Sequence, residues 1–321
     1  MKRRAFLCLM AASAMVSAPA LAQDNQRPAR IVVSFSAGGP VDMVARILAE
    51  QLGKDLNRAV IVDNKPGANG FLGAQEVLRS KPDGNTIWIS SVGTAAINPS
   101  LFQELPYDMR KDFRPVSLIA NNVEVFVINA GLPARNAVDF IENAKNGKTP
   151  PAIASSGVGG IPHLAMLQLK QATDIDFLHV PYRGMAQAVT DVVGGQVAGV
   201  FADVAAVLPQ IQAGRLRPLG IAAPKRHPAL PDVPTFEEQG LVSVDSNNWY
   251  GLFVPAKTPD DIVDDLSATV RKVMENNAVI ERLNQAGTLP QASTAQEMQR
   301  ILDADTAKWG NLLKANNVRP N

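Results

Sequence analysis

Short β-rich runs alternate with segments of helical periodicity along most of the chain. The first run is Ile31–Phe35; a turn over 36–39 follows, and Pro40 stands where a first helical residue would. Apolar residues then recur at helical spacing, at Val41, Val44, Ala45, Leu48 and Leu52. Because a strand, a tight loop and a helix repeat in this order, the pattern predicts an α/β protein built around largely parallel sheets.

The later part of the chain repeats this pattern and predicts two lobes. Two long helices are expected to close the chain, over 259–286 and 294–316, the first capped by Thr258. The segments Val123–Asn129 and Ser243–Trp249 are candidates for crossings between the lobes. We therefore expect lobe I to be discontinuous, made of 23–123 plus 247–321, and lobe II to span 124–246.

The N-terminal residues have the features of a secretory signal peptide. Basic residues at 2–4 precede an apolar run from Ala5 to Val16, and Ala20-Leu21-Ala22 has the small-residue pattern of a cleavage site. The apolar run is shorter than the ~18 residues that a membrane-spanning helix needs. The sequence therefore predicts a signal peptide over 1–22, cleavage after Ala22 and export to the periplasm.

Charge and cysteine content narrow the possible partners. Removal of Lys2, Arg3 and Arg4 changes the formal charge from +1 (31 basic, 30 acidic residues) to −2 (28 basic, 30 acidic). No long run of one sign and few aromatic residues remain, which argues against a nucleic-acid partner. The only cysteine, Cys8, lies in the signal peptide, so the mature chain has no thiol and no cysteine-based metal site.

Two glycine-rich loops between a strand and a helix are candidate anion-binding sites. A helix N-terminus offers unpaired N–H groups and a favourable dipole to an anion. The alternative for the first loop is a tight turn that needs glycine, with Asp42 capping the helix. The second loop resembles a dinucleotide fingerprint, but Pro162 replaces its last glycine and Asp176 precedes its strand, so we expect an anion-binding loop there. The candidate residues in the two loops are Phe35, Ser36, Ala37, Gly38, Gly39, Ser156, Gly157, Gly159 and His163.

Other polar residues follow further predicted strands. Ser91 and Thr94 come after the strand Thr86–Ser90, and Arg183 and Gly184 leave the strand Phe177–Pro181. Asp203 closes an apolar run, where its carboxylate would either bind a donor on a ligand or cap the next helix. The alternative to ligand binding for Arg183 is a charge on the surface or between the lobes. Since ligands bind at the carboxyl ends of strands in open α/β sheets, we include all five residues in the candidate site.

The sequence does not match the common catalytic motifs. Ala154 stands where a nucleophile elbow around Ser156 needs glycine, and the histidines His163, His179 and His227 lack metal-ligand spacing. A Ser156/His163 dyad is the remaining hydrolase candidate, but loop serines near a helix-start histidine are usually structural. We expect no enzymatic activity, no cofactor and no metal site.

Several motifs spread over the whole mature chain occur in the order typical of one family. They are Ser36-Ala37-Gly38-Gly39-Pro40-Val41-Asp42, Asp63-Asn64-Lys65-Pro66-Gly67, Lys81-Pro82-Asp83-Gly84, Ile97-Asn98-Pro99-Ser100-Leu101, His179-Val180-Pro181-Tyr182-Arg183-Gly184 and Pro231-Asp232-Val233-Pro234-Thr235. With these motifs the chain closely resembles the Bug family, the substrate-binding receptors of tripartite tricarboxylate transporters.

The resemblance implies a periplasmic-binding-protein-like architecture, two α/β lobes with a ligand cleft and a hinge between them. It implies that loops matching Phe35–Gly39 and Ser156–Gly160 hold a carboxylate through backbone N–H groups and waters, and that Asp203 receives a donor on the ligand. The family commonly has Pro-Gly-Gly-Gly-Thr-Asp in the first loop, whereas Ala37, Pro40 and Val41 stand at three of these positions here. Since Val41 lacks the hydroxyl, the ligand's identity does not follow from the resemblance.

The expected function is a monomeric periplasmic receptor. It would capture a small carboxylate between its lobes and deliver it to the membrane permease subunits of a tripartite tricarboxylate transporter. A periplasmic sensor subunit for a signalling receptor and an exported hydrolase or isomerase remain the alternatives. Neighbouring genes for permease subunits would favour the transport receptor, and turnover of a bound compound would favour the hydrolase or isomerase.

Overall fold

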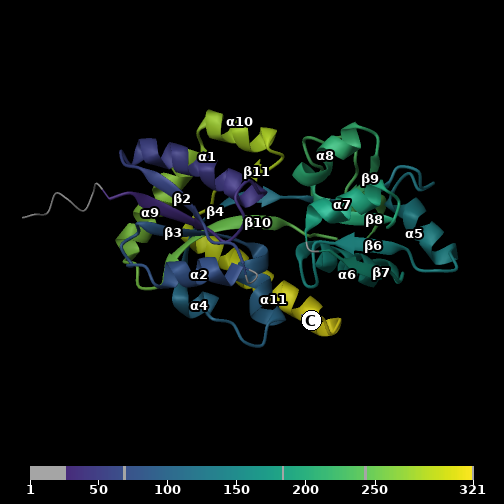
Figure 1. Ribbon diagram of the computed structural model, residues 1–321, viewed down its shortest axis with the longest axis horizontal. Helices are drawn as coiled ribbons and strands as arrows, with labels where there is room; N and C mark the ends of the chain where they lie inside the picture. Colours follow the sequence, from purple (N-terminus) through teal and green to yellow (C-terminus); the bar gives the residue numbers. More distant parts are fainter. Residues whose placement is uncertain (1–26, 68–69, 183, 242–243, 320–321) are drawn as a thin grey trace, which may run out of the picture.

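Two separate β-sheets, each covered by helices, form two lobes that lie side by side (Figure 1). The computed structural model describes residues 27–67, 70–182, 184–241 and 244–319. One lobe contains segments from both ends of the chain, and the other is built from its middle. The architecture is therefore the two-lobed α/β fold expected from the sequence.

Lobe I is organised around a six-stranded sheet with the order β11-β4-β10-β3-β1-β2. Strands β1, β2 and β3 are parallel to one another, while β10 is antiparallel to β3 and β4. Both faces of β1 are buried, which explains its continuous apolar run. The strands are β1 (Ala29–Val33), β2 (Val60–Asn64), β3 (Thr86–Ser91), β4 (Phe113–Asn122), β10 (Asn248–Pro255) and β11 (Leu289–Pro290).

Helices cover both faces of this sheet and create two apolar cores. On one face lie α1 (Pro40–Asp55), α9 (Asp260–Met274) and α10 (Asn277–Gln285). The apolar stripe predicted for α1 is buried there in full. The opposite face carries α2 (Phe71–Leu78), a π turn η3 (Gly93–Ile97), α3 (Asn98–Leu101), α4 (Met109–Asp112) and α11 (Ala295–Ala315).

Lobe II contains a five-stranded sheet with the order β7-β6-β8-β5-β9. Helices α7 and α8 cover one face, and α5 and α6 cover the other. The strands are β5 (Glu124–Asn129), β6 (Ala152–Ser155), β7 (Leu178–Pro181), β8 (Gly199–Asp203) and β9 (Leu216–Ile221). The helices are α5 (Ala137–Asn146), α6 (Ile161–Thr173), α7 (Met185–Val193), α8 (Val204–Gln212) and a short 3₁₀ turn η4 (Glu237–Gln239).

Two segments join the lobes. Val123 connects β4 of lobe I directly to β5 of lobe II, and residues 244–247 lead back into β10. Polar side chains are buried along both segments, among them Asn122, Glu124 and Ser246. The hinge region is therefore polar inside, although the cores on either side are apolar.

Lobe I differs from the sequence prediction at β4, in the helix expected over 259–286 and in the cap of that helix. Strand β4 was not expected, because Pro115 interrupts its β pattern. In the structure Pro115 lies opposite Phe253, at an irregularity in the pairing of β4 with β10. The missing N–H of proline is tolerated at such an irregularity. The single helix expected over 259–286 is two helices, because the Asn276 side chain accepts a hydrogen bond from Ala278 N–H and begins α10. The cap of α9 is Pro259 and not Thr258.

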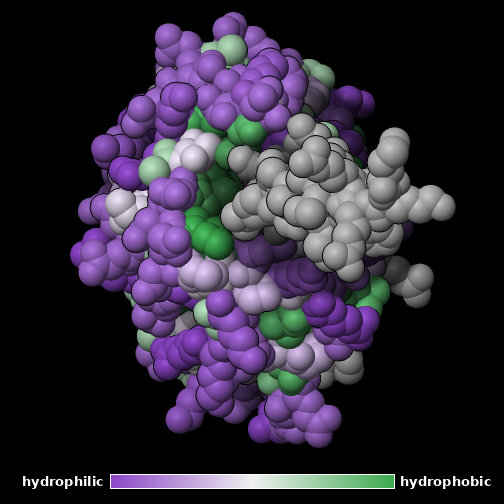
Figure 2. Space-filling model, turned by 90° about the vertical axis from the view of Figure 1, so that its left-hand side faces the viewer, coloured by the Kyte–Doolittle hydropathy of each residue, from purple (hydrophilic) through white to green (hydrophobic). Residues whose placement is uncertain are grey.

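The outer face of lobe I is mostly hydrophilic, with only small groups of apolar side chains (Figure 2). Its apolar residues are instead collected in the two cores beside the sheet. None of the described helices combines the length and the apolar character needed to cross a membrane.

Candidate functional site

A cleft of about 400 Å³ is lined by residues of both lobes. Lobe I contributes the loop after β1, the turn before α2, the end of β3 with η3, and α3; lobe II contributes the loop after β6. None of the described lining residues is charged. They are Ser34, Phe35, Ser36, Pro66, Gly67, Gly70, Ser91, Gly93, Thr94, Ile97, Asn98, Leu101, Ser156, Gly157, Val158, Gly159 and Gly160.

Asp42 fixes the first loop from inside lobe I. Its Oδ2 atom accepts hydrogen bonds from Gly38 N–H at 2.8 Å and from Arg46 Nε at 2.9 Å, and its Oδ1 accepts one from Asn64 at 2.9 Å. Burial opposes ionisation of Asp42, but these hydrogen bonds outweigh it and lower the pKa of the carboxyl. Gly38, at φ +81°, therefore shapes the loop and has its N–H already occupied.

The second loop is fixed by a histidine in the same way. His163 is buried at the start of α6, and its Nδ1 atom accepts a hydrogen bond from Gly159 N–H at 3.0 Å. Its ring stacks on His179 at 3.9 Å, and His179 Nε2 lies 2.6 Å from Ser155 Oγ. Burial, together with the neighbouring His179, lowers the pKa of His163 to about 4, so the ring is neutral and its Nδ1 remains an acceptor.

Several backbone N–H groups of the lining are left for a ligand. Those of Ser36, Ser156 and Val158 are among them, since they have no acceptor among the described residues, whereas Gly157 N–H is bound by Ser155 Oγ and Gly160 N–H by Gly157 O. The loops containing them precede the N-termini of α1 and α6, whose dipoles favour negative charge. The cleft therefore presents donors from two lobes to one small space.

The lobe I wall is closely packed. Trp88 Nε1 donates to Ser34 Oγ at 2.8 Å, and Ser34 Oγ donates to Gly70 O at 3.1 Å. A Cβ atom at Gly70 would lie 2.6 Å from Thr94 Oγ1, and Gly70 adopts φ +90°, so no other residue fits there without displacement. This packing holds the Thr94 side chain against the cleft.

Leu101 of α3 and Gly159 meet across the cleft. A Cβ atom at Gly159 would lie 2.5 Å from Leu101 Cδ2. A second contact lies beside the hinge, where a Cβ atom at Gly287 would come within 2.8 Å of Ala205 Cβ. Glycine at these positions thus permits close approach of the two lobes.

The structure brings together half of the residues expected from the sequence. Phe35, Ser36, Ser91, Thr94, Ser156, Gly157 and Gly159 all line the cleft. The others are not part of its lining. Ala37 and Gly38 border an outer hollow beside α1, Gly39 caps α1, and Gly184 caps α7. His163 supports the second loop, and Asp203 lies at the hinge. Arg183 lies outside the described residues.

Sequence reasoning missed five lining residues whose motifs were visible. Pro66 and Gly67 belong to the turn after β2, and Ile97, Asn98 and Leu101 belong to the Ile97–Leu101 motif. These motifs carried the family resemblance but no site assignment. The reason is structural, because η3 turns the chain after β3 back toward the second loop, and a π turn leaves no clear periodicity in sequence.

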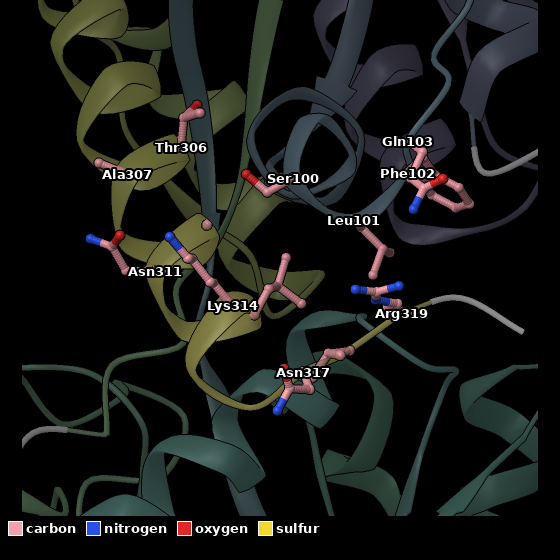
Figure 3. A pocket seen from close by; sticks show the side chains of 13 residues that line it. Ser100, Leu101, Phe102, Gln103, Thr306, Ala307, Asn311, Lys314, Asn317 and Arg319 are labelled. Atoms are coloured by element: carbon pink, nitrogen blue, oxygen red, sulfur yellow. The ribbon is translucent and has the colours of Figure 1, made fainter.

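A larger hollow of about 920 Å³ lies between α3 and the end of α11 (Figure 3). It shares Leu101 with the cleft, but its other lining residues all come from lobe I, and Lys314 and Arg319 are exposed at its edge. A ligand there would not be enclosed by both lobes. In the part of the chain that the structure describes, no three His, Cys, Asp or Glu side chains gather as metal ligands.

Two lobes joined by two segments, with a loop from each lining a shared cleft, define the class of bacterial solute-binding proteins. Within that class, residues 44–318 match the family model described as "Tripartite tricarboxylate transporter family receptor". The chain belongs to this family, whose members are binding proteins for transport and not enzymes.

Individual relatives match this chain over nearly their whole length. BugT of Bordetella pertussis is 30% identical over 97% of this chain and 96% of its own. Three solved structures are each 30% identical: an R. palustris protein with adipate (TM-score 0.82, covering 92% and 99%), periplasmic binding protein BugD (0.78, 92% and 99%) and MatC of Rhodopseudomonas palustris with bound malate (0.76, 89% and 99%). The Bug-family resemblance is thereby confirmed.

The contact between Leu101 and Gly159 leads to a first prediction. Gly159→Ala should weaken ligand binding about tenfold or more, because overpacking of this size costs roughly 1–3 kcal/mol and would hold the lobes apart. Gly214→Ala is the matched control: its φ of +67° is close to the +75° of Gly159, but no atom lies within 4 Å of the added carbon. Isothermal titration calorimetry measures both affinities. Equal affinities for the two variants would contradict the role of this contact, and adding Leu101→Ala should restore binding.

His163 leads to a second prediction, on stability. Its folded-state pKa of about 4 lies below the ordinary 6.5, so the unfolded chain binds the proton more tightly, and stability falls as the pH drops from about 6.5 toward 4. His163 alone should account for about 2 kcal/mol between pH 7 and pH 4.5. His163→Asn keeps an acceptor for Gly159 N–H without titrating, so urea unfolding should show a smaller acid loss. If the acid loss of stability is the same in His163→Asn, then His163 takes up its proton in the native state as readily as in the unfolded chain, which contradicts the prediction.

Proposed function

We propose that the protein is a periplasmic receptor that captures a small carboxylate between its lobes and delivers it to the permease subunits of a tripartite tricarboxylate transporter. The observation that carries this proposal is the uncharged cleft lined from both lobes by Ser36, Ser156 and Val158, whose backbone N–H groups have no acceptor among the described residues. We further propose that 1–22 is removed as a signal peptide during export.

Backbone donors are sufficient to bind a carboxylate. Hydrogen bonds to a charged group contribute about 1.5–3 kcal/mol each, so three or four, less the cost of ordering, correspond to micromolar affinity at about −8 kcal/mol. A space of about 400 Å³ is at the small end of ligand pockets, which favours a compact acid. Relatives with adipate and with malate support the same class of ligand.

Closure of the lobes is proposed as the signal to the permease. We assign 23–123 plus 247–321 to lobe I and 124–246 to lobe II, in agreement with the strand content of the two sheets. A carboxylate that binds donors of both lobes has a higher affinity for the closed arrangement and shifts the equilibrium toward it. The contacts of Leu101 with Gly159 and of Ala205 with Gly287 would then be those of the closed form.

A thermal-shift panel tests the proposal. The mature protein, refolded to remove carried-over ligand, is screened against adipate, malate, citrate, aspartate and benzoate, with glucose as a neutral control and the diamine putrescine as a cationic control. A ligand present at 100 times its Kd should stabilise the native state by about 2.7 kcal/mol. We expect a shift with at least one carboxylate and none with glucose or putrescine. Stabilisation by glucose or putrescine alone would contradict the proposal.

A further inference from the structure

Two carboxyl groups face each other at the hinge. In the pairing of β5 with β8, Glu124 lies directly opposite Asp203, beside the crossing at Val123. Glu124 is only 1% exposed, and its Oε2 atom has no hydrogen-bond partner within the described part of the chain. Asn248, from the second crossing, approaches Asp203 with its amide nitrogen 3.4 Å from each carboxyl oxygen.

No positive charge in the described part of the chain compensates this pair. Neither carboxyl forms an ion pair with any described Lys, Arg or His. The other titratable group facing it is Tyr250 of β10, which burial keeps neutral by raising its pKa well above the ordinary value. The remaining polar neighbours, Ser246 and Asn248, do not ionise. Two carboxylates in such surroundings cannot both be charged at moderate cost, so the pair has to hold a proton.

The two members of the pair differ in how strongly they hold this proton. Burial, and then the charge of Asp203, raise the pKa of Glu124 well above its ordinary range. Burial also raises the pKa of Asp203, but only to about 6, since the Asn248 amide opposes it. The proton of the pair therefore lies on Glu124, which is fully buried with an unpartnered oxygen, and the charge lies on Asp203, which the Asn248 amide approaches.

Asp203 is outside the lining of the cleft, but it ends β8, which runs parallel to β6, and the loop after β6 lines the cleft at the same edge of the sheet. We propose that Glu124 is a positioning residue for ligand binding: by holding the proton of the pair, it leaves Asp203 as an ionised acceptor for a hydroxyl or ammonium group on a ligand that extends from the cleft toward the hinge. The proposal rests on the proposed function, and it adds a residue that acts through Asp203 and not by touching the carboxylate. It predicts that the receptor prefers acids with a donor group to plain diacids while Asp203 is ionised, and that a second negative charge on Glu124 at alkaline pH weakens the binding of every acid.

The experiment compares malate, which has a hydroxyl donor, with adipate, which has none, by calorimetry from pH 5 to pH 9. For the wild-type protein, malate affinity should fall at acid pH as Asp203 gains a proton, near pH 6, and at alkaline pH as Glu124 loses its proton and adds a second negative charge. Glu124→Gln, which is permanently neutral, should abolish the alkaline loss and retain the acid loss. Once protonation of the ligand's own carboxyls is subtracted, adipate binding should lack the acid loss in both proteins.

Controls separate this role from a structural one. Glu142→Gln, an exposed acid on α5, should leave the pH profile unchanged. An alkaline loss that persists in Glu124→Gln, or a loss of affinity that is equal at every pH, would overturn the proposal. If Glu124→Gln does not fold, ¹³C NMR of the wild-type protein labelled at its Glu carboxyls answers the same question. One carboxyl should titrate well above the ordinary range of glutamate, and ordinary acidic titration of all of them would contradict the proposal.

A failure of the proposed function is distinguishable from a failure of this inference. If wild-type protein binds no carboxylate at any pH, the receptor proposal fails. The NMR titration still locates the proton in that case.

Discussion

The cleft depends on two backbone hydrogen bonds that lie behind it. Gly38 N–H is held by Asp42, and Gly159 N–H is held by His163. Each bond fixes a glycine at positive φ, and each leaves neighbouring N–H groups of the same loop without an acceptor in the described chain. A backbone donor near a helix N-terminus is costly to leave unsatisfied once water is excluded. The protein therefore presents the cleft with donors that an anion can satisfy, although no cationic side chain lines its described part.

The proposed function would let one scaffold bind different acids. Backbone donors would recognise the carboxylate that such ligands share, and side chains elsewhere could vary without loss of that contact. The hinge would then supply discrimination, because Asp203 and Glu124 are outside the lining of the cleft and would respond to the rest of the ligand. Asp42 and His163 hold the two loops in place without lining the cleft.

The fold was largely predictable from sequence, because buried parallel strands and amphipathic helices have distinct periods. Strand β4 was missed because Pro115 interrupts its β pattern. The break between α9 and α10 was missed because the sequence around Asn276 does not reveal that its side chain caps a new helix.

Within the site, loop positions followed from the predicted ends of strands, so Ser36 and Ser156 were found. Which N–H groups are already occupied is a property of packing, and so Gly38 and His163 were assigned to the lining although they support it. Glu124 carried no signal, because an acid inside an apolar strand is recognisable as half of a pair only when its partner strand is known.

The central claim is that Ser36, Ser156 and Val158 N–H groups bind the ligand's carboxylate. It is tested most directly by ¹H–¹⁵N NMR of the deuterated protein during titration with a carboxylate that binds. The account predicts downfield shifts for these three amides, while the Gly38 and Gly159 amides, which already donate within the protein, change little. Unchanged resonances for the three, with shifts gathered instead around Ser100 and Lys314 in the larger hollow, would contradict it.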